Sequence, residues 1–127
     1  MAGSIEIRQW LDLIEAIQTP WGISKSSLFD ASVTEMTARV PDLAAKVKRF
    51  IDIKLPNPLN RDALVGKHDR PFTGAMVGYW HCHVATDAIL IYRLENRSVQ
   101  LCLVCQHKDL EGKRLGVTVK RLRAATI

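Results

Sequence analysis

The stretch from Arg70 to Glu111, RPFTGAMVGYWHCHVATDAILIYRLENRSVQLCLVCQHKDLE, predicts a series of antiparallel strands. In residues 77–84, two sets of side chains alternate with the period of a half-buried strand. Residues 88–94 are apolar on both faces, as in a central strand, and residues 99–106 form a third strand. Short turns at 85–87 and 95–98 join the strands, with Asn96 suited to a positive φ. Strands joined by such short turns run antiparallel.

The alternating strand directions bring three candidate site residues to one end of the sheet. His83 lies at the end of the first strand, Asp87 at the start of the second, and His107 just after the third. Imidazole suits acid and base work because its ordinary pKa lies near neutrality. A neighbouring carboxylate fixes the imidazole tautomer, so this rim is the best candidate for a site.

The same stretch resembles the RelE/ParE superfamily of bacterial toxin–antitoxin toxins, in particular its YafQ-like branch. The resemblance implies an α+β RelE-like fold, with an antiparallel, mostly meander sheet and N-terminal helices packed on one face. It also implies a cognate antitoxin protein as partner. The matching positions are residues 69–72, Gly74, Gly78, Tyr79, His83, Val84, Asp87, residues 89–92 and His107.

The resemblance further implies a ribosome-dependent mRNA endoribonuclease that uses no metal or other cofactor. Such cleavage takes a proton from the ribose 2′-OH and gives one to the 5′-oxygen leaving group. We expect His107 to be the general acid, with Asp87 or His83 as base or phosphate-positioning group. Residues expected to contact RNA or its phosphates are Arg70, His68, His81, Lys67, Arg93 and Arg114.

Three positions depart from the YafQ-like pattern. Arg70 stands where that branch has another functional histidine, Ala88 replaces an aromatic residue, and Glu111 replaces a phenylalanine. Arginine holds phosphate but does not shuttle protons at neutral pH. The departures at Ala88 and Glu111 favour an alternative function on the same fold: a non-catalytic gyrase inhibitor or ribosome and RNA binder.

A zinc site is a second alternative, because His81, Cys82 and His83 combine with Cys102, Cys105 and His107 as potential ligands. The spacing disfavours it. In a strand, residues three apart such as Cys102 and Cys105 face opposite sides of the sheet. The three cysteines are better interpreted as small core residues.

Composition indicates one folded domain of 127 residues with a polyanionic partner. Apolar residues make up 47% of the chain, and the net charge is +5. Three cysteines without a signal peptide suggest a reducing, cytoplasmic location. No apolar run approaches the roughly 20 residues that span a bilayer, so no membrane association is expected. The oligomeric state, homo- or hetero-oligomer included, stays open.

The segments around this stretch complete the predicted domain, which spans residues 1–127. An added N-terminal helix is expected at about 4–18 and a first strand at 23–29. Asp30 or Ser32 is expected to cap a helix that ends at Arg39, with Glu35 in the capping box.

A second helix is expected from Pro41 to about Lys54, and the segment 113–127 is expected to be a basic C-terminal extension. This extension forms either a further strand at 116–122 or an exposed basic arm. The apolar stripe of the second helix consists of Leu43, Val47, Phe50 and Ile51.

Overall fold

A computed structural model describes residues 22–54, 70–95 and 97–125 of the chain. Its five strands form one sheet in the order β1-β5-β4-β3-β2. Strands β2 to β5 form the predicted antiparallel meander, whereas β1 lies parallel to β5 at the sheet edge. The sheet is therefore not a strict meander. The strands are β1 (Gly22–Lys25), β2 (Arg70–Pro71), β3 (Trp80–Ala85), β4 (Ala88–Glu95) and β5 (Ser98–Cys105).

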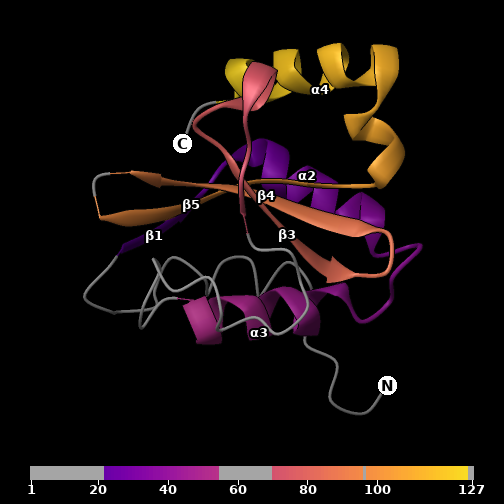
Figure 1. Cartoon of the computed structure of the whole chain (residues 1–127). Helices are drawn as coiled ribbons and strands as arrows, with labels where there is room; N and C mark the ends of the chain where they lie inside the picture. Colours follow the sequence, from indigo (N-terminus) through magenta and orange to yellow (C-terminus); the bar gives the residue numbers. More distant parts are fainter. Residues whose placement is uncertain (1–21, 55–69, 96, 126–127) are drawn as a thin grey trace.

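Helices cover both faces of this sheet, which confirms the predicted α+β class. In Figure 1, α3 lies below the sheet and α4 above it. Two short 3-10 helices, η1 and η2, connect β2 to β3 and β5 to α4. The helices are α2 (Ser27–Met36), α3 (Leu43–Lys54), α4 (Gly112–Ala124), η1 (Gly74–Met76) and η2 (His107–Leu110).

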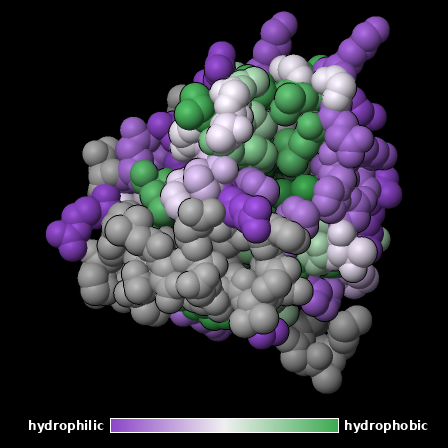
Figure 2. Space-filling view, viewed as in Figure 1, coloured by the Kyte–Doolittle hydropathy of each residue, from purple (hydrophilic) through white to green (hydrophobic). Residues whose placement is uncertain are grey.

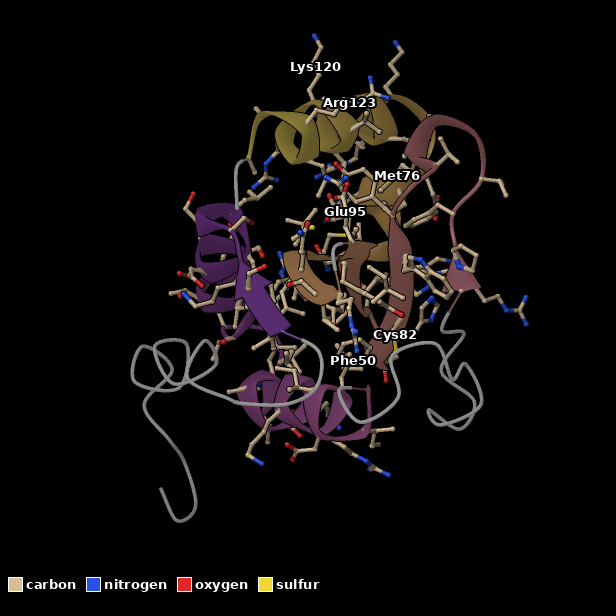
Figure 3. The ribbon with its side chains drawn as sticks, turned by 90° about the vertical axis from the view of Figure 1, so that its left-hand side faces the viewer. Phe50, Met76, Cys82, Glu95, Lys120 and Arg123 are labelled. Atoms are coloured by element: carbon tan, nitrogen blue, oxygen red, sulfur yellow. The ribbon has the colours of Figure 1, made fainter. Side chains whose placement is uncertain are left out.

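Strand β4 is buried on both faces, as its unbroken apolar sequence predicts, and it separates two apolar clusters. Leu90 and Tyr92 belong to the first cluster, which faces α2 and α3. Ile89 and Ile91 belong to the second cluster, which faces α4. Figure 3 shows Phe50 on the α3 side and Met76 on the α4 side. The predicted stripe of α3 is confirmed, since Leu43, Val47, Phe50 and Ile51 are all buried.

Two buried serines bind α2 to the edge of β5 beyond the point where β1 ends. Ser26 caps α2 by accepting a hydrogen bond from Phe29 N at 3.0 Å, and its hydroxyl donates to Cys102 O at 3.0 Å. Ser32 donates to Phe29 O at 2.9 Å and accepts from Val104 N at 2.9 Å. These bonds satisfy strand groups that β1 does not pair.

A β-bulge at Cys102 changes the phase of β5. Ile91 pairs with Leu103 and Tyr92 with Leu101, so Cys102 is the extra residue. Cys102, Leu103 and Cys105 consequently all belong to the second cluster. The prediction that Cys102 and Cys105 face opposite sides is therefore wrong.

Several predicted boundaries differ from the structure. The first strand ends at Lys25, and Ser26, rather than Asp30 or Ser32, caps the helix that follows. Ser26 is the favoured cap because its hydroxyl also donates a hydrogen bond to the Cys102 carbonyl of β5. In the β4–β5 turn, Arg97 has the positive φ, at 55°; Asn96 lies outside the described residues.

The C-terminal extension is a helix, so the predicted strand at 116–122 and the exposed-arm alternative are wrong. Leu115, Thr118, Val119 and Leu122 recur at helical spacing and face the second cluster or η2. The packing of this face outweighs the strand preference of the β-branched residues 117–119.

The predicted N-terminal helix at 4–18 lies outside the described residues. Among the helices of residues 22–54 and 70–125, none combines the length and the apolar character that crossing a bilayer needs.

Replacing Ser32 with alanine should destabilise the fold, because the change leaves the buried Val104 N–H without its acceptor. We expect a loss of about 1–3 kcal/mol in the free energy of unfolding, measured by urea denaturation. The control is Thr34→Ala on the same helix, whose exposed hydroxyl bonds only to Asp30 O. It should change stability by less than about 0.5 kcal/mol. Equal losses in the two variants would contradict this role of Ser32.

Candidate active site

The predicted convergence of His83, Asp87 and His107 at one end of the sheet is present in the structure. The rings of His83 and His107 have centroids 4.8 Å apart at an interplanar angle of 87°. His83 pairs with Ile89 across β3 and β4, and so faces the second cluster. A β-bulge at Val84 directly follows His83. Bulges of this kind redirect side chains at the ends of strands.

His81 extends the pair of imidazoles into a row of rings along β3. Its ring centroid lies 6.1 Å from that of His83. On its other side it stacks on Phe72 at 4.3 Å. Both β3 histidines are half-buried, whereas about half of the His107 side chain is exposed. The row therefore ends at its most accessible ring.

The Asp87 carboxylate holds His107 in position. One oxygen, Oδ1, accepts from His107 N at 2.9 Å and lies 3.0 Å from His107 Nδ1. The other, Oδ2, accepts from Gln106 Nε2 at 2.9 Å. The β3–β4 turn is thereby bound to the end of β5, although these residues are about 20 positions apart in sequence.

These hydrogen bonds lower the pKa of Asp87 below its ordinary value of 3.8. The His107 backbone N–H is the largest cause, followed by the hydrogen bond with the His107 side chain. At neutral pH the carboxylate is ionised and accepts only, so His107 Nδ1 bears the proton between them. Nε2 is then the ring nitrogen that can exchange a proton with a substrate.

Asp109 is a second carboxylate near the site, which orders the start of η2, and the sequence interpretation missed it. Its Oδ2 accepts from Gln106 N at 3.0 Å, which closes a capping box at the start of η2. Its Oδ1 bonds to Arg114, and its carbonyl accepts from Thr118. The spacing of Gln106 and Asp109 is a capping-box pattern, which is the signal that could have revealed it.

A groove of about 780 Å³ adjoins the rim on the side of the α2–α3 connection. Its lining includes His83, Asp87 and Gln106 from the rim, together with Arg39 and Lys46. Sequence interpretation did not single out Arg39, because no local pattern relates it to a turn almost 50 residues later. The remaining lining residues are Val40, Pro41, Asp42, Val84, Ala85 and Thr86.

The other predicted contact residues are distributed unevenly. Arg70 is exposed and pairs with His81 across β2 and β3, so it belongs to the ring row's face. Arg93 is four residues beyond Ile89, about 13 Å along the strand from His83, and it bonds to Glu95. Arg114 bonds to Asp109 at 3.1 Å. His68 and Lys67 lie outside the described residues.

The two remaining departures from the family pattern have different positions. Ala88 is fully buried in the first cluster, on the sheet face opposite His83. An aromatic side chain at position 88 would therefore lie on the other face of the sheet, so the ring row loses no ring through the alanine. Glu111 is exposed between η2 and α4, and its side chain makes no capping bond there.

The cysteines lie in the core. Burial raises the pKa of both the Cys102 and the Cys105 thiol to about 12. Both are therefore neutral thiols at pH 7 and unsuited as they stand to bind zinc, which takes thiolates. Over residues 22–54, 70–95 and 97–125, no three His, Cys, Asp or Glu side chains are grouped so that they could hold a metal ion.

The lowered pKa of Asp87 can be measured by following its side-chain carboxyl carbon in an NMR titration. We expect a value below 3.8 in the native chain. In His107→Ala it should rise only part of the way, because the backbone N–H still donates. A folded-state pKa below the unfolded one means that the interaction stabilises the fold above about pH 4 and is lost as the pH falls through the lowered pKa.

Lys48→Gln is the control for that titration, since Lys48 lies on α3 and bonds to Asp52. It should leave the Asp87 titration unchanged. An Asp87 pKa at or above 3.8 in the native chain would contradict the arrangement of hydrogen bonds.

Solved toxin structures are similar to this chain. The structure of YafQ from E. coli strain BL21(DE3) is 27% identical, with a TM-score of 0.61, and the match covers 75% of this chain and all of YafQ. The toxin of the E. coli DinJ-YafQ complex is 28% identical at a TM-score of 0.60, over 73% of this chain and 99% of that one. The RelBE2 toxin–antitoxin complex from Mycobacterium tuberculosis shares the fold alone, at 16% identity and a TM-score of 0.52, over 70% of this chain and 100% of that one.

A sequence search of curated proteins found no match. A family model described as "Bacterial toxin of type II toxin-antitoxin system, YafQ" matches residues 23–112, which contain the ring row, Asp87 and His107. This match spans well over half of the 127 residues. The chain therefore belongs to the YafQ family of type II toxin–antitoxin toxins.

Proposed function

We propose that this toxin is a ribosome-dependent mRNA endoribonuclease that cleaves by acid–base chemistry with the ribose 2′-OH as nucleophile. The observation that supports it is the His83–His107 pair, with ring centroids 4.8 Å apart and His107 held by the Asp87 carboxylate. A reaction of this kind needs two proton-transfer groups within reach of the same phosphate. Two neighbouring imidazoles at an exposed rim meet that need.

In this mechanism His107 is the general acid and His83 the base. Asp87 is a positioning residue rather than a base, because it accepts three hydrogen bonds and its pKa is lowered. Its bond to Nδ1 leaves the Nε2–H of protonated His107 to donate to the 5′-oxygen. His83 takes the proton of the 2′-OH, a group that RNA has and DNA lacks.

The phosphate needs cationic donors as its charge develops in the transition state. Arg70, opposite His81, supplies a guanidinium on the ring row's face. Arg39 brings positive charge to the groove, where Lys46 pairs with Asp42 at 3.6 Å. The groove thus gives a strand of mRNA a path past His83 and Asp87. His68 and Lys67 stay candidates for further phosphate contacts.

The partner that controls this activity is a cognate antitoxin. Solved relatives include the E. coli DinJ-YafQ and the M. tuberculosis RelBE2 toxin–antitoxin complexes. An antitoxin segment laid over the ring row and groove would keep mRNA from His107. Because the proposed substrate is mRNA on the ribosome, the toxin acts in the cytoplasm.

Replacing His107 with glutamine should abolish growth arrest on induced expression and remove new mRNA 5′-ends mapped in the same cells. Loss of one positioned acid lowers the cleavage rate by about 10²- to 10⁴-fold. Lys48→Gln, on the exposed side of α3, is the control and should arrest growth as the native chain does.

Arrest without new 5′-ends in the native chain would move the function to a non-catalytic toxin, either a gyrase inhibitor or a ribosome and RNA binder. Cleavage that persists undiminished in His107→Gln would exclude His107 as the acid. No arrest at all, with folded protein present, would contradict activity as a toxin under these conditions.

Asp87→Asn tests the positioning role. The amide keeps the shape of the side chain but takes away the carboxylate that holds the Nδ1 proton. We expect the cleavage rate to fall by about 10²- to 10⁴-fold, with RNA affinity unchanged. ¹⁵N NMR of the His107 imidazole should show loss of the Nδ1–H tautomer.

Gln106→Ala is the comparison, since it removes one of the three hydrogen bonds to Asp87, together with the bond that the Gln106 side chain accepts in the capping box of η2. It should reduce the rate less and keep the His107 tautomer. If His107 kept the Nδ1–H tautomer in Asp87→Asn, the positioning role of Asp87 would be contradicted.

A further inference from the structure

Helix α4 is held rigidly over the second cluster. Its Leu115, Val119 and Leu122 pack into that cluster on one side of the helix. Thr118 Oγ1 donates to Asp109 O at 2.7 Å, which ties the helix to η2. The outward side chains of α4 therefore have a fixed direction relative to His107, which lies in η2.

Helix α4 as a whole carries a number of positive charges equal to the net charge of the chain. Five of the 18 basic residues lie in this helix, which has no acidic residue. Outside it the chain has 13 basic and 13 acidic residues, and so no formal net charge. The five cations are all exposed: Lys113, Arg114, Lys120, Arg121 and Arg123.

Two of these cations, Lys113 and Lys120, define the outward face of α4. Lys113 and Lys120 are seven residues apart, so they lie on the same side of the helix about 10 Å from each other. That side is opposite Leu122 and the other packed residues. Figure 3 shows Lys120 projecting away from the sheet. In Figure 2, hydrophilic side chains project from the top of the molecule, where Figure 1 places α4.

Helix stability explains only part of this composition: Arg121 and Arg123 lie in the last turn, where the helix dipole favours cations, and Arg114 bonds to Asp109. Cations in the first turn, Lys113 and Arg114, are unfavourable next to the positive end of the helix dipole. Lys120 and Arg123 are like charges three residues apart and repel each other. Lys113 and the Lys120–Arg123 pair therefore oppose local helix stability, and such a conflict indicates a functional surface.

The chemistry of this face fits phosphates better than a protein partner. Protein interfaces have apolar and aromatic residues at their centre and few charges there. On the outward face of α4, Val117 is a large apolar side chain with substantial exposure, at 61%. A row of cations without aromatic anchors instead matches a nucleic-acid backbone, which binds through phosphate contacts.

We propose that the outward face of α4 is an RNA-binding surface, which holds the phosphate backbone beside the His107 site and independently of its base sequence. The choice of RNA as the polyanion rests on the proposed function. The surface lies beyond residues 23–112, where the family match ends. It would add affinity for structured or single-stranded RNA, such as ribosomal RNA next to the mRNA.

The test is equilibrium binding of the full chain to a fluorescein-labelled 20-nucleotide 2′-O-methyl RNA, followed by anisotropy at several salt concentrations. This RNA has no free 2′-OH and is not cleaved, so binding is separated from catalysis. The variant is Lys113→Gln/Lys120→Gln. The control, Lys48→Gln/Arg49→Gln, removes the same charge from the exposed side of α3.

Each phosphate contact with single strands contributes about 0.7 to the slope of log affinity against log salt. We therefore expect the α4 variant to lower that slope by about 1.4 and to weaken binding about 25-fold at 0.1 M salt. The control should change each value far less. Equal effects in the two variants would overturn the proposal.

A second probe separates RNA from an acidic protein. If a 20-residue polyglutamate bound as tightly as the RNA and lost the same affinity in the α4 variant, the assignment to RNA would be wrong. Failure of the proposed catalysis has a different signature: mRNA 5′-ends would be absent in cells, whereas binding of the uncleavable RNA would still depend on α4.

Discussion

The β-bulge at Cys102 is the constraint on which the arrangement of the site depends. One extra residue in a strand moves every later side chain to the other face of the sheet. With Cys102 inserted, Cys105 faces the second cluster, on the same side as His83. Without it, Cys105 would face α2 and α3. His107, two residues later, would then enter η2 from the opposite face of the sheet. Hydrogen bonds from Ser26, the cap of α2, and to Ser32, within α2, fix this part of β5 against the helix.

The convergence of the site could be predicted from the sequence because it depends on local signals. Alternation in β3, the apolar run of β4 and two short turns determine strand direction, and direction alone brings His83, Asp87 and His107 to one rim. The bulge has no such signal, since a register shift depends on partners 72 or 76 residues away in sequence. The error about Cys102 and Cys105 follows from that.

The helix boundaries show the same limit. Residues 23–29 resemble a strand locally, but the Ser26 hydroxyl, once β5 is beside it, both caps α2 and satisfies Cys102 O. The β-branched residues 117–119 favour a strand, yet the second cluster needs a cover that Leu115 and Leu122 supply only as a helix. In both segments tertiary packing determined the outcome. Arg39 became a site candidate only through the fold.

Asp87 illustrates why a candidate's role needs geometry as well as position. Chain position alone leaves a carboxylate near two histidines free to be base, acid or orienting group. Three accepted hydrogen bonds make it a weaker base, because the interactions that lower its pKa also reduce its affinity for a proton. The same bonds leave Nε2 as the proton-exchanging nitrogen of His107. The strength of Asp87 as a hydrogen-bond anchor and its weakness as a base therefore have one cause.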